Sequence, residues 1–244
     1  MKKIILPIIV LIFATSIHCA DAAEQLYTTQ PPATPELAKS GHWKVGVSTL
    51  ETINPQQLST KDFTTREDRP LTLEVWYPAD NGTTSIPATY ADLTRSKQRF
   101  ELQGVAWRDA EPLKGETTFP LVVLSHGYTG SRSIMFYLAE HLASHGYVVV
   151  GIDHTDSTNA EVDFFKAPYS GFTSTLFHRA RDQQFVLDYF STQETPFANL
   201  VDTDNAAVIG YSMGGYGALN TAGGCYQYTE ASLLQFGFTP EQAA

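Results

Sequence analysis

The chain has 244 residues, enough for one large domain or two small ones. Hydrophobic residues make up 43% of it and charged residues 17%, which is typical of a globular protein and excludes a disordered one. A formal net charge of -10 argues against nucleic acid or another polyanion as a partner.

The amino terminus has the pattern of an export signal. Lys2 and Lys3 precede an apolar run at 4–17, and small residues around Ala22 offer a cleavage site. We therefore predict a signal peptide over residues 1–22 and a secreted or periplasmic protein. The apolar run is too short to cross a bilayer comfortably, so we expect no stable membrane span.

The chain contains two cysteines, Cys19 and Cys225. Cys19 lies in the predicted signal, where a lipid anchor is a less favoured alternative to cleavage. Removal of the signal leaves Cys225 as the single cysteine, which is then either buried or paired with a group outside this chain.

Residues 23–42 are polar and rich in proline, and they predict a loose lead-in to a domain at 43–244. Two β-rich runs, at 43–50 and 71–77, predict an antiparallel strand pair. The stretch 78–118 has two interpretations. It is either an insertion that shapes one wall of a site, or a surface excursion with one short helix.

The pattern then alternates between buried apolar runs and helical periodicity. The predicted strands are 119–124, 147–152 and 206–209, and the predicted helices are 133–144, 176–190 and 213–222. Such alternation predicts an α/β fold in which these strands pair in parallel through right-handed crossovers.

Ser212 lies where a predicted buried strand ends and a predicted helix begins. Its frame is Gly-Tyr-Ser-Met-Gly, which matches the turn that lifts a nucleophilic hydroxyl above a sheet. Gly210 and Gly214 remove side chains that would clash in so tight a turn. The helix amino terminus that follows offers free N–H groups to an oxyanion.

A second segment, "PLVVLSHGYTGSR", ends another predicted buried strand in a glycine-punctuated loop. Together with "LASHGYVVVGIDHTD" and "VIGYSMGGYGAL", it resembles the α/β-hydrolases, in the branch of platelet-activating-factor acetylhydrolase and dienelactone hydrolase. The resemblance implies a mostly parallel sheet with helices on both faces. It implies Ser212 as the nucleophile, the backbone N–H groups of Met213 and Tyr128 as the oxyanion hole, and no cofactor.

The resemblance also implies an acid and a histidine after the serine, and here the sequence departs from the pattern. All seven histidines precede Ser212, and the acids that follow are Glu230 and Glu241. Three explanations stay open: a fragment of a longer hydrolase, a natural non-catalytic relative, or use of an earlier histidine.

Two features of the sequence favour the fragment. Thr239-Pro240-Glu241 is a good helix start close to the end of the chain. The sheet would also stop at 206–209, a run whose composition predicts burial on both faces. We therefore expect the C-terminal strands and helices of the domain to be missing, and we expect the piece to fold poorly alone.

The expected reaction is hydrolysis of small or short-chain carboxylic esters, with lipid esters as one option, through an acyl-enzyme at Ser212. A non-catalytic binding protein, an acyltransferase and a peptidase are alternatives on the same scaffold. The oligomeric state is not predicted.

Other polar residues receive less specific interpretations. Asp153, His154 and Asp156 follow a strand but are too few to specify a metal, so none is expected. His126 is expected to brace the oxyanion loop by hydrogen bonding. The helical residues His178, Arg179, Arg181 and Asp182 predict a solvated or loop-pinning ion-pair face; Asp182 alternatively stabilises the 153–156 loop through an arginine.

Overall fold

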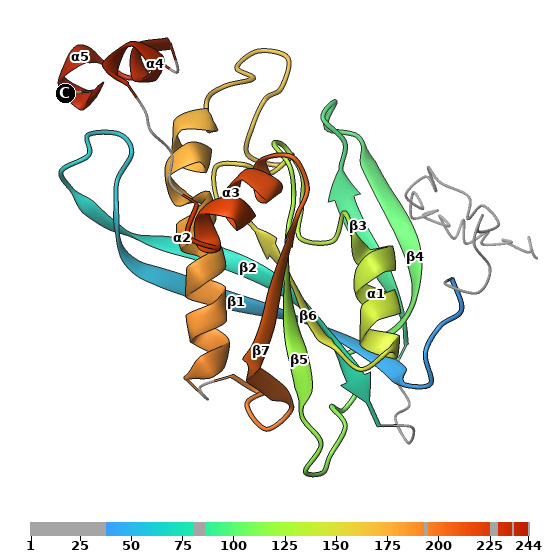
Figure 1. Ribbon diagram of the computed structural model, residues 1–244. Coiled ribbons are helices and arrows are strands. Elements are labelled where there is room, and N and C mark those ends of the chain that lie inside the picture. Colours follow the sequence, from blue (N-terminus) through green and yellow to red (C-terminus); the bar gives the residue numbers. More distant parts are fainter. Residues whose placement is uncertain (1–37, 81–85, 193–194, 225–228, 236, 244) are drawn as a thin grey trace, which may run out of the picture.

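The computed structural model describes residues 38–80, 86–192, 195–224, 229–235 and 237–243 (Figure 1). The predicted signal peptide, most of the lead-in and Cys225 lie outside these residues. The strands are β1 (Lys44–Leu58), β2 (Arg66–Ala79), β3 (Pro87–Leu93), β4 (Arg99–Arg108), β5 (Phe119–Ser125), β6 (Val148–Asp153) and β7 (Val201–Gly210). The helices are α1 (Phe136–Ser144), α2 (Phe172–Ser191), α3 (Met213–Thr221), α4 (Glu230–Gln235) and α5 (Pro240–Ala243).

The seven strands form one sheet in the order β3-β4-β1-β2-β6-β5-β7. β5 pairs in parallel with β6 and β7, as predicted, and β1 pairs antiparallel with β2. The α/β class is confirmed, but the sheet is mixed rather than mostly parallel. Its N-terminal part contributes four strands in place of the expected two, and it joins the parallel part through an antiparallel β2–β6 pair.

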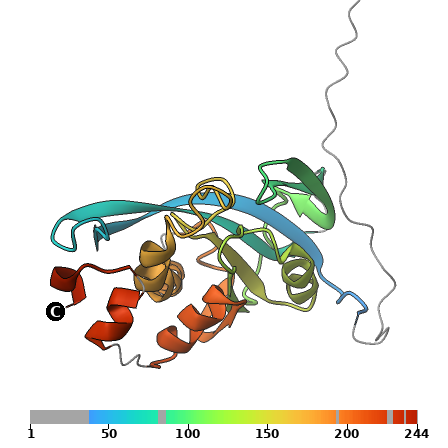
Figure 2. The same cartoon turned by 90° about the horizontal axis from the view of Figure 1, so that it is seen from above.

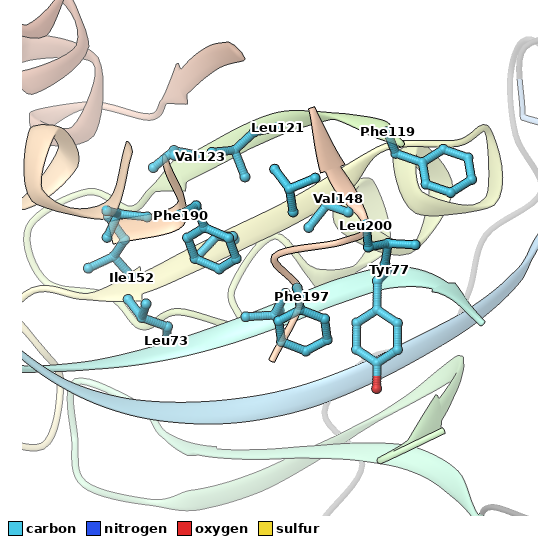
Figure 3. Packing of buried hydrophobic residues seen from close by; sticks show 14 of the residues in the cluster. Leu73, Tyr77, Phe119, Leu121, Val123, Val148, Ile152, Phe190, Phe197 and Leu200 are labelled. Atoms are coloured by element: carbon cyan, nitrogen blue, oxygen red, sulfur yellow. The ribbon is translucent and has the colours of Figure 1, made fainter. Parts of the chain in front are cut away.

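The core lies on both faces of the sheet because neighbouring side chains of a strand point to opposite sides. Leu121 and Val123 of β5 belong to the cluster under α2, where Phe190 and Phe197 also pack (Figure 3). Val122 belongs to a second cluster under α1. Helices therefore cover both faces, as the α/β class requires.

The predicted elements are present with shifted ends. The helix expected at 133–144 begins at Phe136, and it ends as predicted before Gly146, whose φ of +90° stops it. The helix expected at 176–190 begins earlier, at Phe172. In the described part of the chain, no helix has both the length and the apolar composition that crossing a membrane requires.

The stretch 78–118 folds as the β3–β4 hairpin, and its described part contains no helix. Glu140 of α1 holds the hairpin to the body of the protein. Its buried carboxylate accepts hydrogen bonds from the Tyr90 hydroxyl at 2.7 Å and from the backbone N–H of Ala106 at 3.0 Å.

β7 was predicted to be buried on both faces, and this prediction is wrong. Its residues 204–207 are exposed, and Ile209 keeps 36% of its surface accessible. The physical reason is position: β7 is an edge strand, paired with β5 on one side and with no described strand on the other (Figure 1). α4 and α5 lie apart from this edge, beside the outer end of the β1–β2 hairpin (Figure 2).

Candidate active site

Ser212 sits in a strained turn between β7 and α3. Its φ of +53° and ψ of -116° lie in a region that residues with a side chain rarely adopt. A β-carbon at Gly214 would lie 1.9 Å from the carbonyl oxygen of Ser125, and one at Gly210 would lie 2.1 Å from that of Gly214. Both glycines are therefore required by close backbone contacts. The exposed Ser212 side chain stands at the carboxyl end of the sheet.

The loop after β5 lies against this turn. A β-carbon at Gly127 would be 3.2 Å from the Cβ of Ser212, so the two segments meet closely. The backbone N–H of Tyr211 donates to the carbonyl of Ser125 at 3.0 Å and joins the turn to the end of β5. Among the described residues, no hydrogen-bond acceptor is found for the N–H of Met213 or of Tyr128. The structure thus leaves both of the predicted oxyanion donors available.

A cavity of about 480 Å³ opens beside Ser212. Its lining residues are Leu93, Thr94, Arg95, Ser96, Phe100, Gly127, Tyr128, Thr129, Gly130, Ile134, Asn159, Phe165, Tyr211 and Ser212. The turn of the β3–β4 hairpin supplies one wall, which supports the first interpretation of the 78–118 stretch.

The hairpin turn is fastened to the loop that follows β6. The Lys97 ammonium donates to three backbone carbonyls, those of Asn159 at 2.6 Å, Val162 at 2.9 Å and Ala160 at 3.1 Å. In the opposite direction, the side-chain amide of Asn159 donates a hydrogen bond to the carbonyl of Leu93 at 2.9 Å. These bonds fix the wall of the cavity relative to the sheet.

A chain of buried hydrogen bonds lies beneath the site. The Ser125 hydroxyl is 2.8 Å from Nε2 of His154, and Nδ1 of His154 is 2.9 Å from the Asp182 carboxylate. Arg69 donates to the same carboxylate through Nε at 2.8 Å and Nη2 at 3.0 Å. Ser125, His154 and Asp182 are each at most 1% exposed. The trio has the connectivity of a serine hydrolase triad, yet a substrate cannot reach it.

Burial keeps the two histidines beneath the site, His126 and His154, neutral. It lowers the pKa of His154 well below the ordinary value of 6.5, and the charges of Arg179 and Arg69 lower it further. Burial likewise lowers the pKa of His126, with Arg179 again adding to the effect. Since Asp182 accepts only from a protonated Nδ1, His154 is the tautomer whose Nε2 accepts from Ser125.

Helix α2 connects the two halves of the site. Arg179 donates to the carbonyl of His126 at 2.8 Å, in the loop after β5, and also to the Ser157 hydroxyl. Gln183, one turn further along, donates to the carbonyl of Gly214 at 3.0 Å. Burial lowers the pKa of Arg179 to about 9. One helix therefore sets the distance between the loop after β5 and the Ser212 turn.

The expectation of a solvated face on this helix is wrong for His178, Arg179 and Asp182, which are all buried, the last two completely. The alternative, in which Asp182 acts through an arginine, is confirmed: Arg69 joins Asp182 to Asp156 and to the carbonyl of Thr155. The cause is that α3 packs closely against α2, since a β-carbon at Gly217 would lie 2.5 Å from Cγ of Arg179.

The bracing role expected of His126 is also present, because its Nδ1 is 2.6 Å from the carbonyl of Gly127. The acids at the end of β6 and in the loop after it are engaged with arginines: Asp153 pairs with Arg132 and Asp156 with Arg69. Among the described residues, no three potential ligands gather as a metal site would need.

The Ser212 hydroxyl itself has no hydrogen-bond partner in the described part of the chain. The two histidines beneath the site are engaged elsewhere, His154 with Ser125 and His126 with the backbone N–H of His154. The arrangement thus offers a presented hydroxyl, two free N–H donors and a cavity. It does not offer a base among these residues.

The neutral buried histidines predict a loss of stability in mild acid. Below pH 6.5 an unfolded chain binds protons at His126 and His154 that the folded protein does not bind. The free energy of unfolding should therefore decrease as the pH is lowered below 6.5, by up to about 1.4 kcal/mol per pH unit for each imidazole. Urea titrations between pH 7.5 and pH 5 measure this slope. A His154→Gln variant should reduce it and the exposed His42→Gln should not, whereas a flat wild-type profile would contradict the assignment.

Comparison with known sequences gives three results. A family model described as PET hydrolase-like matches residues 110–226. A cutinase of Thermobifida alba is 39% identical over 106 residues, which is 43% of this chain and 31% of that protein. The platelet-activating factor acetylhydrolase of Cavia porcellus is 35% identical over 71 residues, 28% of this chain and 16% of that protein.

Among solved structures, a ferulic acid esterase from Streptomyces cinnamoneus superposes with a TM-score of 0.53 at 25% identity, covering 79% of this chain and 57% of that one. The sequence match to the Thermobifida alba cutinase covers about a third of the length of that protein. The region that the family model matches, residues 110–226, contains both the loop after β5 and the Ser212 turn. With the sheet order and the strained serine turn, these likenesses support an assignment to the α/β-hydrolase superfamily.

Proposed function

We propose that the protein is a serine hydrolase of carboxylic esters, with Ser212 as the nucleophile. The observation that carries the proposal is the Ser212 turn, in which a strained, exposed hydroxyl stands beside a cavity and two N–H groups without acceptors. Backbone strain at a presented nucleophile is typical of functional turns. The names of the relatives, a cutinase and a ferulic acid esterase, point to esters.

In this mechanism the Ser212 oxygen attacks the ester carbonyl carbon while its proton passes to a base. The N–H groups of Met213 and Tyr128 stabilise the oxyanion. The bond to the alcohol then breaks, and the alcohol leaves with a proton from the protonated base. Water attacks the resulting acyl-enzyme in the same way and regenerates the Ser212 hydroxyl.

The base and its acid are proposed to lie on a segment outside the described residues that pairs with the free edge of β7. The apolar edge of the fold supports this placement, because Ile209 of β7 and Leu219 of α3 are 36% and 67% exposed. A further strand beside β7 would cover this surface and bring its own carboxyl end next to Ser212. The proposal has three further parts. The protein is exported through a signal peptide at residues 1–22, its domain begins at residue 43, and its substrates are short-chain or lipid esters.

A burst experiment tests the proposal on the protein produced from its native gene. Mixed with 4-nitrophenyl butyrate, it should release close to one equivalent of nitrophenol rapidly if deacylation is slower than acylation, and then turn over steadily. An added alcohol that diverts the acyl group would assign an acyltransferase instead. Release no faster than with Ser212→Ala protein would contradict the proposal.

The second candidate is a non-catalytic binding protein, favoured by the Ser212 hydroxyl's lack of a partner among the described residues. Such a protein would bind an ester in the cavity without releasing its alcohol. Calorimetric binding together with absent turnover would establish this alternative.

A further inference from the structure

We propose that Arg95 forms an anion subsite in the cavity beside Ser212, so that the preferred esters carry a carboxylate. This inference rests on the proposed function of the same site. Arg95 lies in the turn between β3 and β4, and it is the only charged residue among the described residues that line the cavity. A protein of net charge -10 thus presents a single cation there.

The Arg95 guanidinium is held in place with most of its donors unused. Its Nη2 donates to the carbonyl of Tyr128 at 3.2 Å, and its Cζ lies 4.4 Å from the centre of the Phe164 ring. Among the described residues it has no carboxylate partner and no other hydrogen bond. A guanidinium has five N–H donors, so about four stay available to a ligand.

Several hydrogen bonds hold the turn that carries Arg95. Lys97 fastens it to the loop after β6 through three backbone carbonyls. Within the turn, the N–H of Lys97 donates to the carbonyl of Thr94 at 2.9 Å, and the Thr94 and Ser96 hydroxyls are 2.9 Å apart. Since little order has to be gained on binding, the guanidinium is preorganised for a ligand.

The position of Arg95 ties it to the reacting centre. It holds the carbonyl of Tyr128, the residue whose N–H is a proposed oxyanion donor. A planar guanidinium with free donors matches a carboxylate, which it can bind through two parallel hydrogen bonds. The rest of the lining is apolar or neutral and offers such a group no other counter-ion. A carboxylate on the acyl or on the alcohol part of the ester would satisfy the same chemistry.

The experiment compares matched esters with the protein produced from its native gene. The acyl arm uses 4-nitrophenyl hydrogen glutarate against 4-nitrophenyl pentanoate. The alcohol arm uses 4-carboxyphenyl butyrate against 4-carbamoylphenyl butyrate. In each arm, kcat/KM for the anionic ester is divided by kcat/KM for the neutral ester. This ratio for the wild-type protein is then divided by the same ratio for the Arg95→Gln variant. The resulting double ratio does not depend on the intrinsic reactivity of the esters.

We expect this double ratio to be about fivefold in one arm at 0.1 M salt, as an accessible ion pair gives, and to approach one at 1 M salt. Arg95→Lys should keep part of the preference. Arg99→Gln, at an exposed position nearby and outside the cavity lining, should keep all of it. A double ratio of one in both arms, with the neutral esters still hydrolysed, would overturn the subsite and leave the proposed function standing.

A binding measurement separates the subsite from catalysis. In Ser212→Ala protein, 4-nitrophenyl hydrogen glutarate should bind about fivefold more weakly once Arg95→Gln is added. Should esters not be hydrolysed at all, this difference would still support the subsite, and equal affinities would overturn it.

Discussion

Replacing Ser212 by alanine is expected to lower kcat/KM for 4-nitrophenyl butyrate by about 10⁴- to 10⁶-fold, the loss that follows removal of an activated nucleophile. The protein should keep its fold, because the exposed hydroxyl has no hydrogen-bond partner among the described residues. Steady-state kinetics and a urea unfolding curve on the same preparation measure both quantities.

The strain at Ser212 gives this experiment a matched control. Alanine at a φ of +53° retains the strain of about 1–3 kcal/mol, whereas glycine relieves it. The flexibility of glycine in the unfolded chain offsets about 0.4–1 kcal/mol of that gain. The Ser212→Gly variant should therefore be inactive yet about 1 kcal/mol more stable than the Ser212→Ala variant. If the glycine variant were instead the less stable of the two, the backbone geometry described for the turn would be contradicted.

Asp182→Asn is expected to cost about 3–5 kcal/mol of stability, because it removes the buried counter-ion of Arg69 and leaves only the partly exposed Asp156, at 3.3 Å, to balance its charge. Arg69 is 6% exposed, and burial alone would lower the pKa of its guanidinium. The negative charges of Asp182 and Asp156 outweigh burial, so the pKa of Arg69 is raised. An asparagine amide would also turn donors toward Arg69 or His154, which are donors themselves. Urea unfolding at pH 7.5 measures the loss.

The control for this variant is Asp188→Asn on the same helix. Asp188 is exposed and lies outside the buried hydrogen-bond chain, so its replacement should change stability by less than about 0.5 kcal/mol. Equal effects of the two variants would contradict the role assigned to Asp182, because both remove one negative charge from α2.

The features that the sequence predicted are local ones. Gly210 and Gly214 are required because a side chain there would clash with backbone within a few residues of Ser212 or at the end of the adjacent strand. The five-residue frame around Ser212 therefore predicts most of the turn. The alternation of strands and helices likewise follows from periodicity in short windows. Element ends moved by a few residues, as for α2, whose first turn packs against the loop after β6 rather than following its own pattern.

Of the buried hydrogen-bond chain, the sequence suggested only that Asp182 acts on the 153–156 loop through an arginine. Which arginine it is, and that Ser125 and His154 belong to the chain, could not be predicted, because the members come from distant parts of the sequence. Arg69 and Asp182 are separated by 113 positions, and no pattern marks Asp182 as buried rather than solvated. One signal was available: Ser125 and His154 follow the ends of two predicted parallel strands, which places them at one edge of the sheet. The β3–β4 hairpin was missed as such because its alternation is interrupted by polar turn residues.

The central claim is that the reactive serine is Ser212 and not Ser125. Both hydroxyls lie at the carboxyl end of the sheet, and only Ser125 already has a histidine and an aspartate in line behind it. Ser125 is completely buried, however, whereas Ser212 is exposed beside a cavity.

The most direct test is to treat the protein produced from its native gene with a fluorophosphonate, digest it and find the modified peptide by mass spectrometry. We expect one adduct, on Ser212, and none on Ser125 in folded protein. An adduct on Ser125, or an unmodified Ser212 in protein that hydrolyses esters, would contradict this claim.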